Sequence, residues 1–262
     1  MPYCTARPSM ERALKADELK VEVYANRTDM GTAAAQDVAE RMKQVISEKG
    51  RVMMVFAAAP SQNEFLAALA ADKSLDWRRV IAFHLDEYVA LPPDAPQGFG
   101  NYLRRHLFEL VKPGFIHFMN GFTSDLQAEC RRYSELLAAN PPDIACIGIG
   151  ENGHLAFNDP SVADFNDPAR VKVVELEERC RLQQVHDGCF NDLASVPTHA
   201  LTMTVPAIVS AASIHCIVPG VTKAEAVRDT IKGPVATSCP ASILRRYATA
   251  TLYLDRDSAA LL

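Results

Sequence analysis

One apolar run that ends in glycines and is followed by polar side chains restricts the fold of this chain more than any other feature. Residues 143–149 (DIACIGI) form a run of the length expected for a strand buried on both faces. Gly148 and Gly150 then allow a sharp turn with open space beside the backbone. In open α/β sheets, ligands bind outside the carboxyl ends of the strands. The loop after residue 149 is therefore a predicted site.

Similar apolar or alternating runs recur along the chain and are separated by helical patterns. The predicted strands are residues 20–25, 52–57, 81–85, 115–118, 143–149, 170–176, 197–204, 213–218 and 250–254. Strands that alternate with helices favour a single-domain α/β fold, doubly wound, with a mostly parallel sheet and helices on both faces. We expect a polar N-terminal segment at 1–19 and one α/β domain at 20–262, with 20–25 as an edge strand. Residues 179–190 receive no assignment.

Helix ends follow from capping residues. Thr28 or Asp29 is expected to begin the first helix and Gly50 to end it, while Ser124 and Thr222 are the expected caps of two later helices.

Composition and charge exclude several classes of protein. The net charge of −5 argues against a nucleic-acid or anionic-membrane partner. No apolar run reaches the length of a membrane span, and the first 20 residues lack the hydrophobic core of a signal peptide. The seven cysteines are scattered and form no CxxC pair, so neither a zinc site nor a disulfide framework is expected. These features indicate a reduced cytoplasmic protein.

Polar side chains follow two of the predicted strands. Asn152, His154 and Asp159 lie in the loop after residues 143–149, and an imidazole suits proton transfer near neutral pH. The same pattern also fits a polar loop whose histidine merely caps a turn. Asp86 and Glu87 directly follow residues 81–85, and adjacent carboxylates are poor strand and core residues, which favours a chemical role.

Two further features point to an anion. The loop around Ala58, Ala59 and Ser61 joins a strand to a helix, where backbone N–H groups can hold a phosphate, although a plain connection has the same composition. Lys223 occupies the first turn of a predicted helix, which is unfavourable for a cation unless it neutralises a bound anion.

Three motifs resemble the glucosamine-6-phosphate deaminase/isomerase family. They are HLDEY at 84–88 followed by Leu91-Pro92, GIGENGHLAFNDP at 148–160, and PGVTKA at 219–224. The resemblance covers roughly residues 20–255 and implies a Rossmann-like parallel sheet. It also implies conversion of an amino-sugar phosphate to a ketose phosphate with release of ammonia, without a cofactor or a metal.

The resemblance also assigns roles. Asp86 would move a proton between C2 and C1 of the sugar. His154 would open the pyranose ring, supported by Asn152 and Asp159. The phosphate would be held by Lys223 with the loop that contains Ala58, Ala59 and Ser61, and Glu87 and Gly153 would belong to the substrate-binding set.

The chain departs from the family pattern at several positions. Asn152 stands where an aspartate is usual, Asp159 replaces a glutamate, and residues 58–61 replace Thr-Gly-Gly-Thr. The arginine that helps to bind phosphate has no clear counterpart, and Arg181 or His186 is expected nearby.

Two other functions remain open at this point. A 6-phosphogluconolactonase would share the fold and the histidine at the strand end, but it typically has a Thr-Ala-Ser-Leu type of run after that histidine. A non-catalytic sugar-phosphate sensor would carry a DNA-binding module, for which residues 1–19 are too short. The identity of the hexosamine phosphate, glucosamine or galactosamine, and the formation of a homo-oligomer also stay open.

Overall fold

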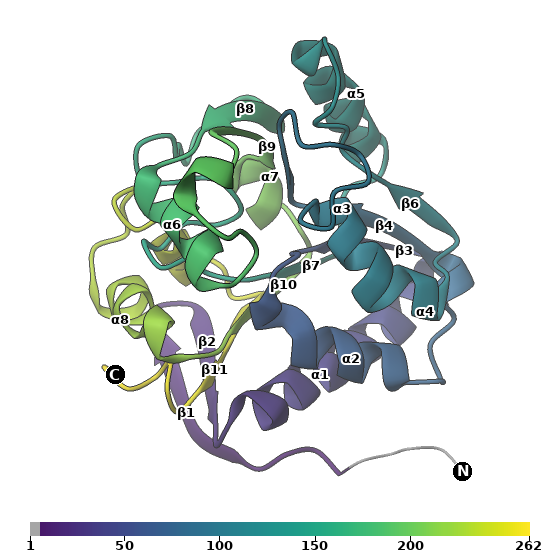
Figure 1. Cartoon of the computed structure of the whole chain (residues 1–262). Helices are drawn as coiled ribbons and strands as arrows, with labels where there is room; N and C mark the ends of the chain where they lie inside the picture. The colour runs from purple at the N-terminus through teal and green to yellow at the C-terminus, as the bar shows by residue number, and fades with distance from the viewer. Residues whose placement is uncertain (1–5) are drawn as a thin grey trace.

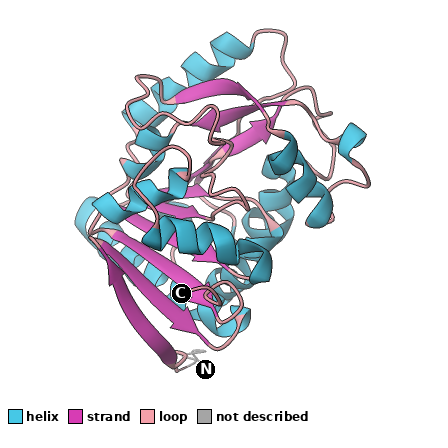
Figure 2. Cartoon of the chain, turned by 90° about the vertical axis from the view of Figure 1, so that its left-hand side faces the viewer, coloured by secondary structure: helices cyan, strands magenta, loops and turns pink. Residues whose placement is uncertain are grey.

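Eight strands form the central sheet of the computed structural model, which describes residues 6–262 (Figures 1 and 2). Their order is β1-β2-β11-β10-β7-β3-β4-β6, and all neighbours are parallel except β1 and β2. The mostly parallel sheet is thus confirmed. The strands are β1 (Met10–Ala16), β2 (Leu19–Tyr24), β3 (Val52–Phe56), β4 (Val80–His84), β6 (Phe115–His117), β7 (Ile144–Ile147), β10 (Ser213–Val218) and β11 (Ala250–Asp255).

The direction in which the sheet grows reverses between β3 and β7. From β3 the chain adds β4 and β6 on one side, and it then returns to place β7 on the other side of β3, followed outward by β10 and β11. The loops that leave β3 and β7 therefore diverge to opposite faces of the sheet. A crevice opens where they separate, at the carboxyl ends of the two strands.

Side chains of β7 alternate between two hydrophobic cores. Ile144 and Cys146 pack in the core that contains helices α1 (Arg27–Lys49) and α2 (Asn63–Ala71). Ala145 and Ile147 pack in the opposite core, which is covered by α5 (Leu126–Ala139), α7 (Val205–Val209) and α8 (Ala224–Lys232). In Figure 1, α1 and α2 lie side by side below the sheet. A strand buried on both faces is why 143–149 reads as continuously apolar.

The ends of α1 show which capping predictions hold. Gly50 adopts a left-handed conformation (φ 75°) and donates its N–H to Ile46, as expected for a C-cap. The N-cap is Asn26, whose side chain accepts a hydrogen bond from Asp29 N at 2.9 Å. The expected caps Thr28 and Asp29 are wrong because the extended backbone ends at Asn26, two residues earlier.

The other two predicted caps are also displaced. Asp125 caps α5 through Ala128 N at 2.8 Å, in place of Ser124. Thr222 lies inside a 3-10 turn, Val221–Lys223, and α8 begins after it.

A second, antiparallel sheet lies beyond the main one, at the top of Figure 1, in the order β5-β9-β8. Its strands are β5 (Asp86–Tyr88), β9 (His199–Met203) and β8 (Val171–Glu175). The expectation of a single sheet is therefore incomplete. The acidic pair at the start of β5 hides the strand, because backbone pairing with residues 200–202 requires no apolar side chain.

The N-terminal edge also differs from expectation. Met10–Ala16 forms the edge strand β1, so β2 is an inner strand paired with both β1 and β11. Most of β1 is exposed, and its apolar residues do not alternate with polar ones, so the period-two signal is missing. The unassigned segment contains α6 (Glu178–His186). The two remaining α-helices of residues 6–262 are α3 (Phe99–Leu103) and α4 (Glu109–Val111). A π-helical turn, Arg104–Phe108, joins them.

Two negative findings apply to residues 6–262 only. No helix there is long and apolar enough to cross a membrane. The six cysteines of this range are all free thiols, while Cys4 lies outside the described residues.

Asp143 joins the two central strands, which makes it a test of the fold. Its buried carboxylate accepts from Met53 N at 2.9 Å and contacts Lys49 Nζ at 2.5 Å. Asp143→Ala should lower the free energy of unfolding by about 1–3 kcal/mol, because a buried N–H loses its acceptor. Lys49→Met removes a half-exposed cation but leaves the acceptor of Met53 N in place, so its loss should be the smaller of the two. Urea unfolding measures both, and equal losses would contradict this assignment.

Candidate active site

A pocket opens at the carboxyl ends of β3, β4 and β7, where the strand order reverses. Six residues of the predicted site line it: Ala58, Ala59, Ser61, Asp86, His154 and Lys223. Asn152 and Asp159 lie behind His154 and reach the pocket through contacts with it. Glu87 and Gly153 are not part of its lining.

The loop after β7 holds His154 against the backbone of Gly150. Gly150 N donates to His154 O at 3.0 Å, and Gly153 N donates to Gly150 O at 3.0 Å, so the chain doubles back on itself. A Cβ at position 150 would lie 2.1 Å from His154 Cε1. Gly150 is therefore required for the close approach of the imidazole.

His154 and Asp159 lie against each other at the edge of the pocket. His154 Nδ1 lies 3.0 Å from Asp159 Oδ1, and the side chains are 9% and 0% exposed. Since Nδ1 faces the carboxylate, Nε2 is the nitrogen available for proton transfer in the pocket.

Asn152 acts on this pair through Asp159. Its Nδ2 donates to Asp159 Oδ1 at 2.8 Å, and its Oδ1 accepts from the backbone N of His154 at 3.1 Å. The other carboxylate oxygen of Asp159 accepts from Glu177 N at 3.1 Å. Burial alone would raise the pKa of Asp159, but His154 and these donors outweigh burial and lower it. Asp159 is thus a stable carboxylate that can neutralise a protonated imidazole.

Asp86 sits where the chain leaves the main sheet. Leu85 N still bonds to Phe56 O, whereas Asp86 already pairs with β9. The Asp86 side chain is buried and lines the pocket. Burial, aided by the neighbouring charge of Glu87, raises the pKa of Asp86 well above its usual range. A carboxylate in this state is a stronger base than an exposed aspartate.

Glu87 lies outside the lining of this pocket and bonds to backbone groups, and its expected place in substrate binding stays a prediction. Its carboxylate accepts from the backbone N of Tyr88 and Phe99 at 3.0 Å each and of Gly100 at 2.9 Å. Burial raises the pKa of Glu87, and these N–H donors oppose that effect. Glu87 anchors the start of α3 beside the pocket.

Gly153 likewise serves the loop and not the ligand. It has a φ of +84°, and an added Cβ would lie 2.7 Å from Cys239 Sγ. Its carbonyl accepts from Ala241 N at 2.8 Å, which ties the His154 loop to the segment after α8.

Lys223 is a buried cation at the far end of the pocket. The Lys223 residue is 5% exposed. No carboxylate among residues 6–262 lies within 4.0 Å of its Nζ. Burial lowers the pKa of Lys223, while Asp187, Glu151 and Cys180 act in the opposite direction. A buried cation without a partner fits an anionic ligand.

The basic residues expected beside Lys223 do not line the pocket. Arg181 Nη2 donates to the carbonyls of Leu193 and Val196 at 2.7 and 2.9 Å. The His186 side chain is 60% exposed and lies 3.7 Å from Glu151. Both side chains of α6 therefore contact groups outside the pocket lining.

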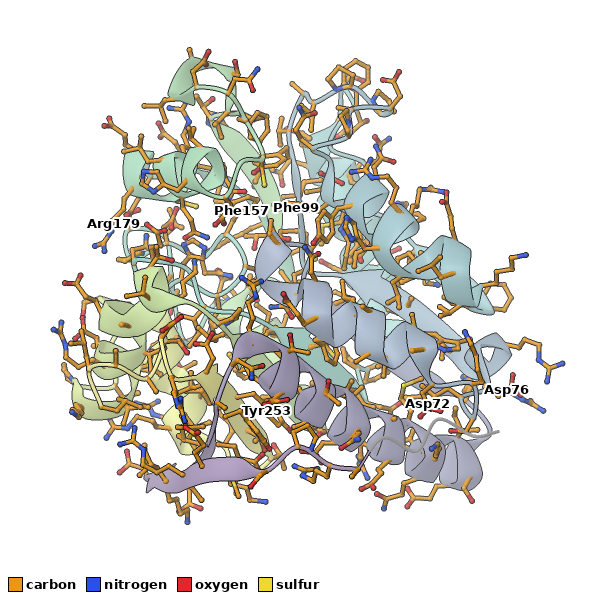
Figure 3. The ribbon with its side chains drawn as sticks, turned by 60° about the horizontal axis from the view of Figure 1, so that its bottom comes forward. Asp72, Asp76, Phe99, Phe157, Arg179 and Tyr253 are labelled. Atoms are coloured by element: carbon orange, nitrogen blue, oxygen red, sulfur yellow. The ribbon has the colours of Figure 1, made fainter. Side chains whose placement is uncertain are left out.

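Sequence reasoning missed several residues of the pocket wall. Gln183 and Gln184 come from α6, whose weak amphipathic pattern concealed the helix. The rings of Phe99 and Phe157 stack with their centroids 5.5 Å apart and form an apolar wall of the pocket (Figure 3). Aromatic residues in polar loops carried no distinguishing signal.

One side-chain group among residues 6–262 has the spacing of metal ligands. Ligand atoms of His154, Asp159 and Cys180 lie within 4.8 Å of one another. Burial raises the pKa of the Cys180 thiol, which favours the protonated form that binds metals poorly. The oxygens of Asp159 already accept hydrogen bonds. These contacts serve a proton relay, and the expectation of no metal stays a prediction.

Fold and site together define an α/β protein whose pocket at the β3–β7 junction brings together a buried aspartate, an imidazole beside a carboxylate and a buried lysine. Over residues 25–253, the sequence matches the family described as glucosamine-6-phosphate isomerases/6-phosphogluconolactonase. The chain belongs to this family.

Curated relatives agree with that assignment. Glucosamine-6-phosphate deaminase of Lactobacillus delbrueckii subsp. bulgaricus is 32% identical and covers 93% of this chain and 100% of its own length. The Bacillus thuringiensis deaminase is 36% identical, covering 84% of this chain and 82% of its own.

Solved structures extend the comparison. A monomeric glucosamine-6-phosphate deaminase superposes with a TM-score of 0.84 at 31% identity, covering 92% of this chain and 99% of that one. The 6-phosphogluconolactonase of Trypanosoma brucei has a TM-score of 0.75 at 17% identity, covering 92% and 98%, and shows a shared fold only.

The contact between Gly150 and the imidazole gives a prediction for the site. Gly150→Ala should displace the His154 ring and reduce turnover of a hexosamine 6-phosphate by about 10²-fold or more, the scale of a lost acid–base group. Ammonia release measures the effect. Gly188→Ala, at a positive φ with open space around it, serves as the control and should retain turnover. Full activity of Gly150→Ala would show that this placement of His154 is not used.

Proposed function

We propose that this protein deaminates a hexosamine 6-phosphate, giving a ketose 6-phosphate and ammonia. The observation that carries the proposal is one pocket holding a base with a raised pKa, Asp86, an imidazole backed by a carboxylate, and the buried cation Lys223. The deaminase relatives support glucosamine 6-phosphate as the substrate. Galactosamine 6-phosphate remains the second substrate to test.

Ring opening falls to His154. Its Nε2 takes the proton of the anomeric hydroxyl and delivers a proton to the ring oxygen, which breaks the bond between C1 and that oxygen. Asp159 lies 3.0 Å from Nδ1 and neutralises the imidazolium formed in between. Asn152 holds Asp159 in place.

Asp86 performs the isomerisation of the open chain. Its carboxylate takes the C2 proton and returns it to C1, while one ammonium proton passes to O1. C2 is left as an iminium, and water then replaces ammonia there to give the ketose. The steps involve no net oxidation or reduction, so no redox cofactor is proposed.

The opposite end of the pocket holds the phosphate. Lys223 supplies the charge, and the turn that contains Ala58, Ala59 and Ser61 supplies polar groups next to it. The six free thiols among the described residues suit a reducing compartment, and we place the protein in the cytoplasm on that ground. No nucleic acid or membrane partner is proposed.

A lactonase function is the second candidate because the lactonases share this fold. Hydrolysis of a lactone needs His154 to activate water but gives no task to a buried carboxylate on the other wall. Activity on 6-phosphogluconolactone that exceeds activity on hexosamine phosphates would therefore favour the lactonase over the deaminase.

The Asp86 side chain provides the direct test. Asp86→Asn preserves shape but removes the base, so turnover should fall by about 10²–10⁴-fold, with a much smaller change in substrate binding. In D2O, the unaltered enzyme should place deuterium at C1 of the ketose, and the variant should not. Ordinary ammonia release by the variant would overturn the role of Asp86.

The raised pKa of Asp86 also predicts a pH dependence. The reaction needs the carboxylate form, so kcat should fall on acidification, starting at a higher pH than an ordinary aspartate would give. The measurement uses kcat, because kcat reflects ionisation of the enzyme–substrate complex. The ratio kcat/KM also reflects ionisation of the free substrate. A kcat that stays flat down to about pH 4, the usual range of an aspartate, would contradict the prediction.

A further inference from the structure

The side-chain amide of Gln184 is a polar group of the pocket wall that makes no hydrogen bond within the protein over residues 6–262. The residue is only 7% exposed. Its neighbour Gln183 differs, since Gln183 Oε1 accepts from Glu151 N at 2.8 Å. The Gln184 amide therefore has both a donor and an acceptor available to a ligand in the pocket.

Gln184 lines the same pocket as Lys223. Cys180 and Gln184 stand four residues apart on α6 and so share one face of the helix. Cys180 lies close enough to Lys223 to interact with its charge. The face of α6 that carries Gln184 therefore lies on the side of the pocket where Lys223 is found.

The anion end offers one full positive charge. Lys223 is the only lysine or arginine among the described residues that line the pocket. Pro60, in the turn beside it, has no N–H to donate, and Ser61 offers a hydroxyl. Arg181 and His186, on the same helix as Gln184, make other contacts.

We propose that Gln184 is the second ligand of the substrate's anionic group, so that the subsite combines one cation with a neutral amide. Such a subsite balances a single negative charge and gains little from a second one. It therefore accepts a singly charged sulfate ester nearly as well as a doubly charged phosphate ester. The inference rests on the proposed function for the position of the anion and adds the charge that the subsite selects.

Glucose 6-phosphate and glucose 6-sulfate test this directly, because neither carries an amino group to release. Calorimetric titration at about pH 8, where a phosphate monoester is doubly charged, measures Kd without turnover. In the unaltered protein the two Kd values should agree within about tenfold. Gln184→Ala should weaken both ligands by about fivefold or more, the worth of one hydrogen bond to a charged group.

A charge change at the same position sharpens the test. Gln184→Arg should tighten glucose 6-phosphate by about tenfold, and the sulfate by clearly less, because a second cation favours the second negative charge. Gln44→Arg, on the exposed face of α1, adds the same charge elsewhere and should leave both Kd values unchanged. Lys223→Met should abolish binding of both ligands.

Three results would overturn the inference. Unchanged Kd values in Gln184→Ala would show that the amide is not a ligand. Phosphate binding more than about 100-fold tighter than sulfate binding in the unaltered protein would reveal a second cation. Equal tightening of both ligands in Gln184→Arg would show that the position does not discriminate charge. The expected Kd pattern without any ammonia release from hexosamine phosphates would instead support the inference and overturn the proposed function.

Discussion

The reversal of strand order between β3 and β7 is the constraint on which the rest of the molecule depends. Loops that leave neighbouring parallel strands toward opposite faces cannot fill the space between them, so a crevice is a property of the topology itself. The loop after β3 brings Ser61 to this crevice and the loop after β7 brings His154. Asp86 arrives from β4, the next strand along, where the chain turns into the second sheet.

Three carboxylates near the crevice have different surroundings, and their properties differ accordingly. Asp86 faces the pocket and burial raises its pKa, which makes it a base. The carboxylate of Glu87, the next residue, accepts hydrogen bonds from three backbone N–H groups and anchors α3. Asp159 is fully buried too, but its donors and His154 lower its pKa, so it stays charged. Asp86 and Glu87 have different surroundings because neighbouring side chains of a strand, here β5, point to opposite faces.

The sequence predicts the parallel sheet and the catalytic loops because both depend on local patterns. Strands buried on both faces appear as apolar runs, and a histidine after a glycine turn stands out at the end of such a run. The second sheet and Gln184 could not be predicted in this way. β5 pairs through its backbone while displaying two acidic residues, and α6 has the polar composition of a surface segment although Gln183 and Gln184 are buried. The acidic side chain of Glu87 suggested chemistry and the family resemblance suggested Gly153, but Glu87 bonds to backbone groups and Gly153 packs against Cys239, which only the tertiary structure reveals.

The departures at Asn152 and Asp159 make sense as a pair. A glutamate at 159 could reach the imidazole from farther away, whereas the shorter Asp159 still lies 3.0 Å from His154 Nδ1. Asn152 donates to the same oxygen of Asp159 at 2.8 Å, which a carboxylate at position 152 could not do. A charge at 152 would also face Glu177, whose Oε2 lies 3.4 Å from Asn152 Nδ2. The Asn152 amide thus keeps the short Asp159 carboxylate oriented toward His154 and separates it from the Glu177 carboxylate. The shorter acid at 159 and the neutral amide at 152 therefore suit each other.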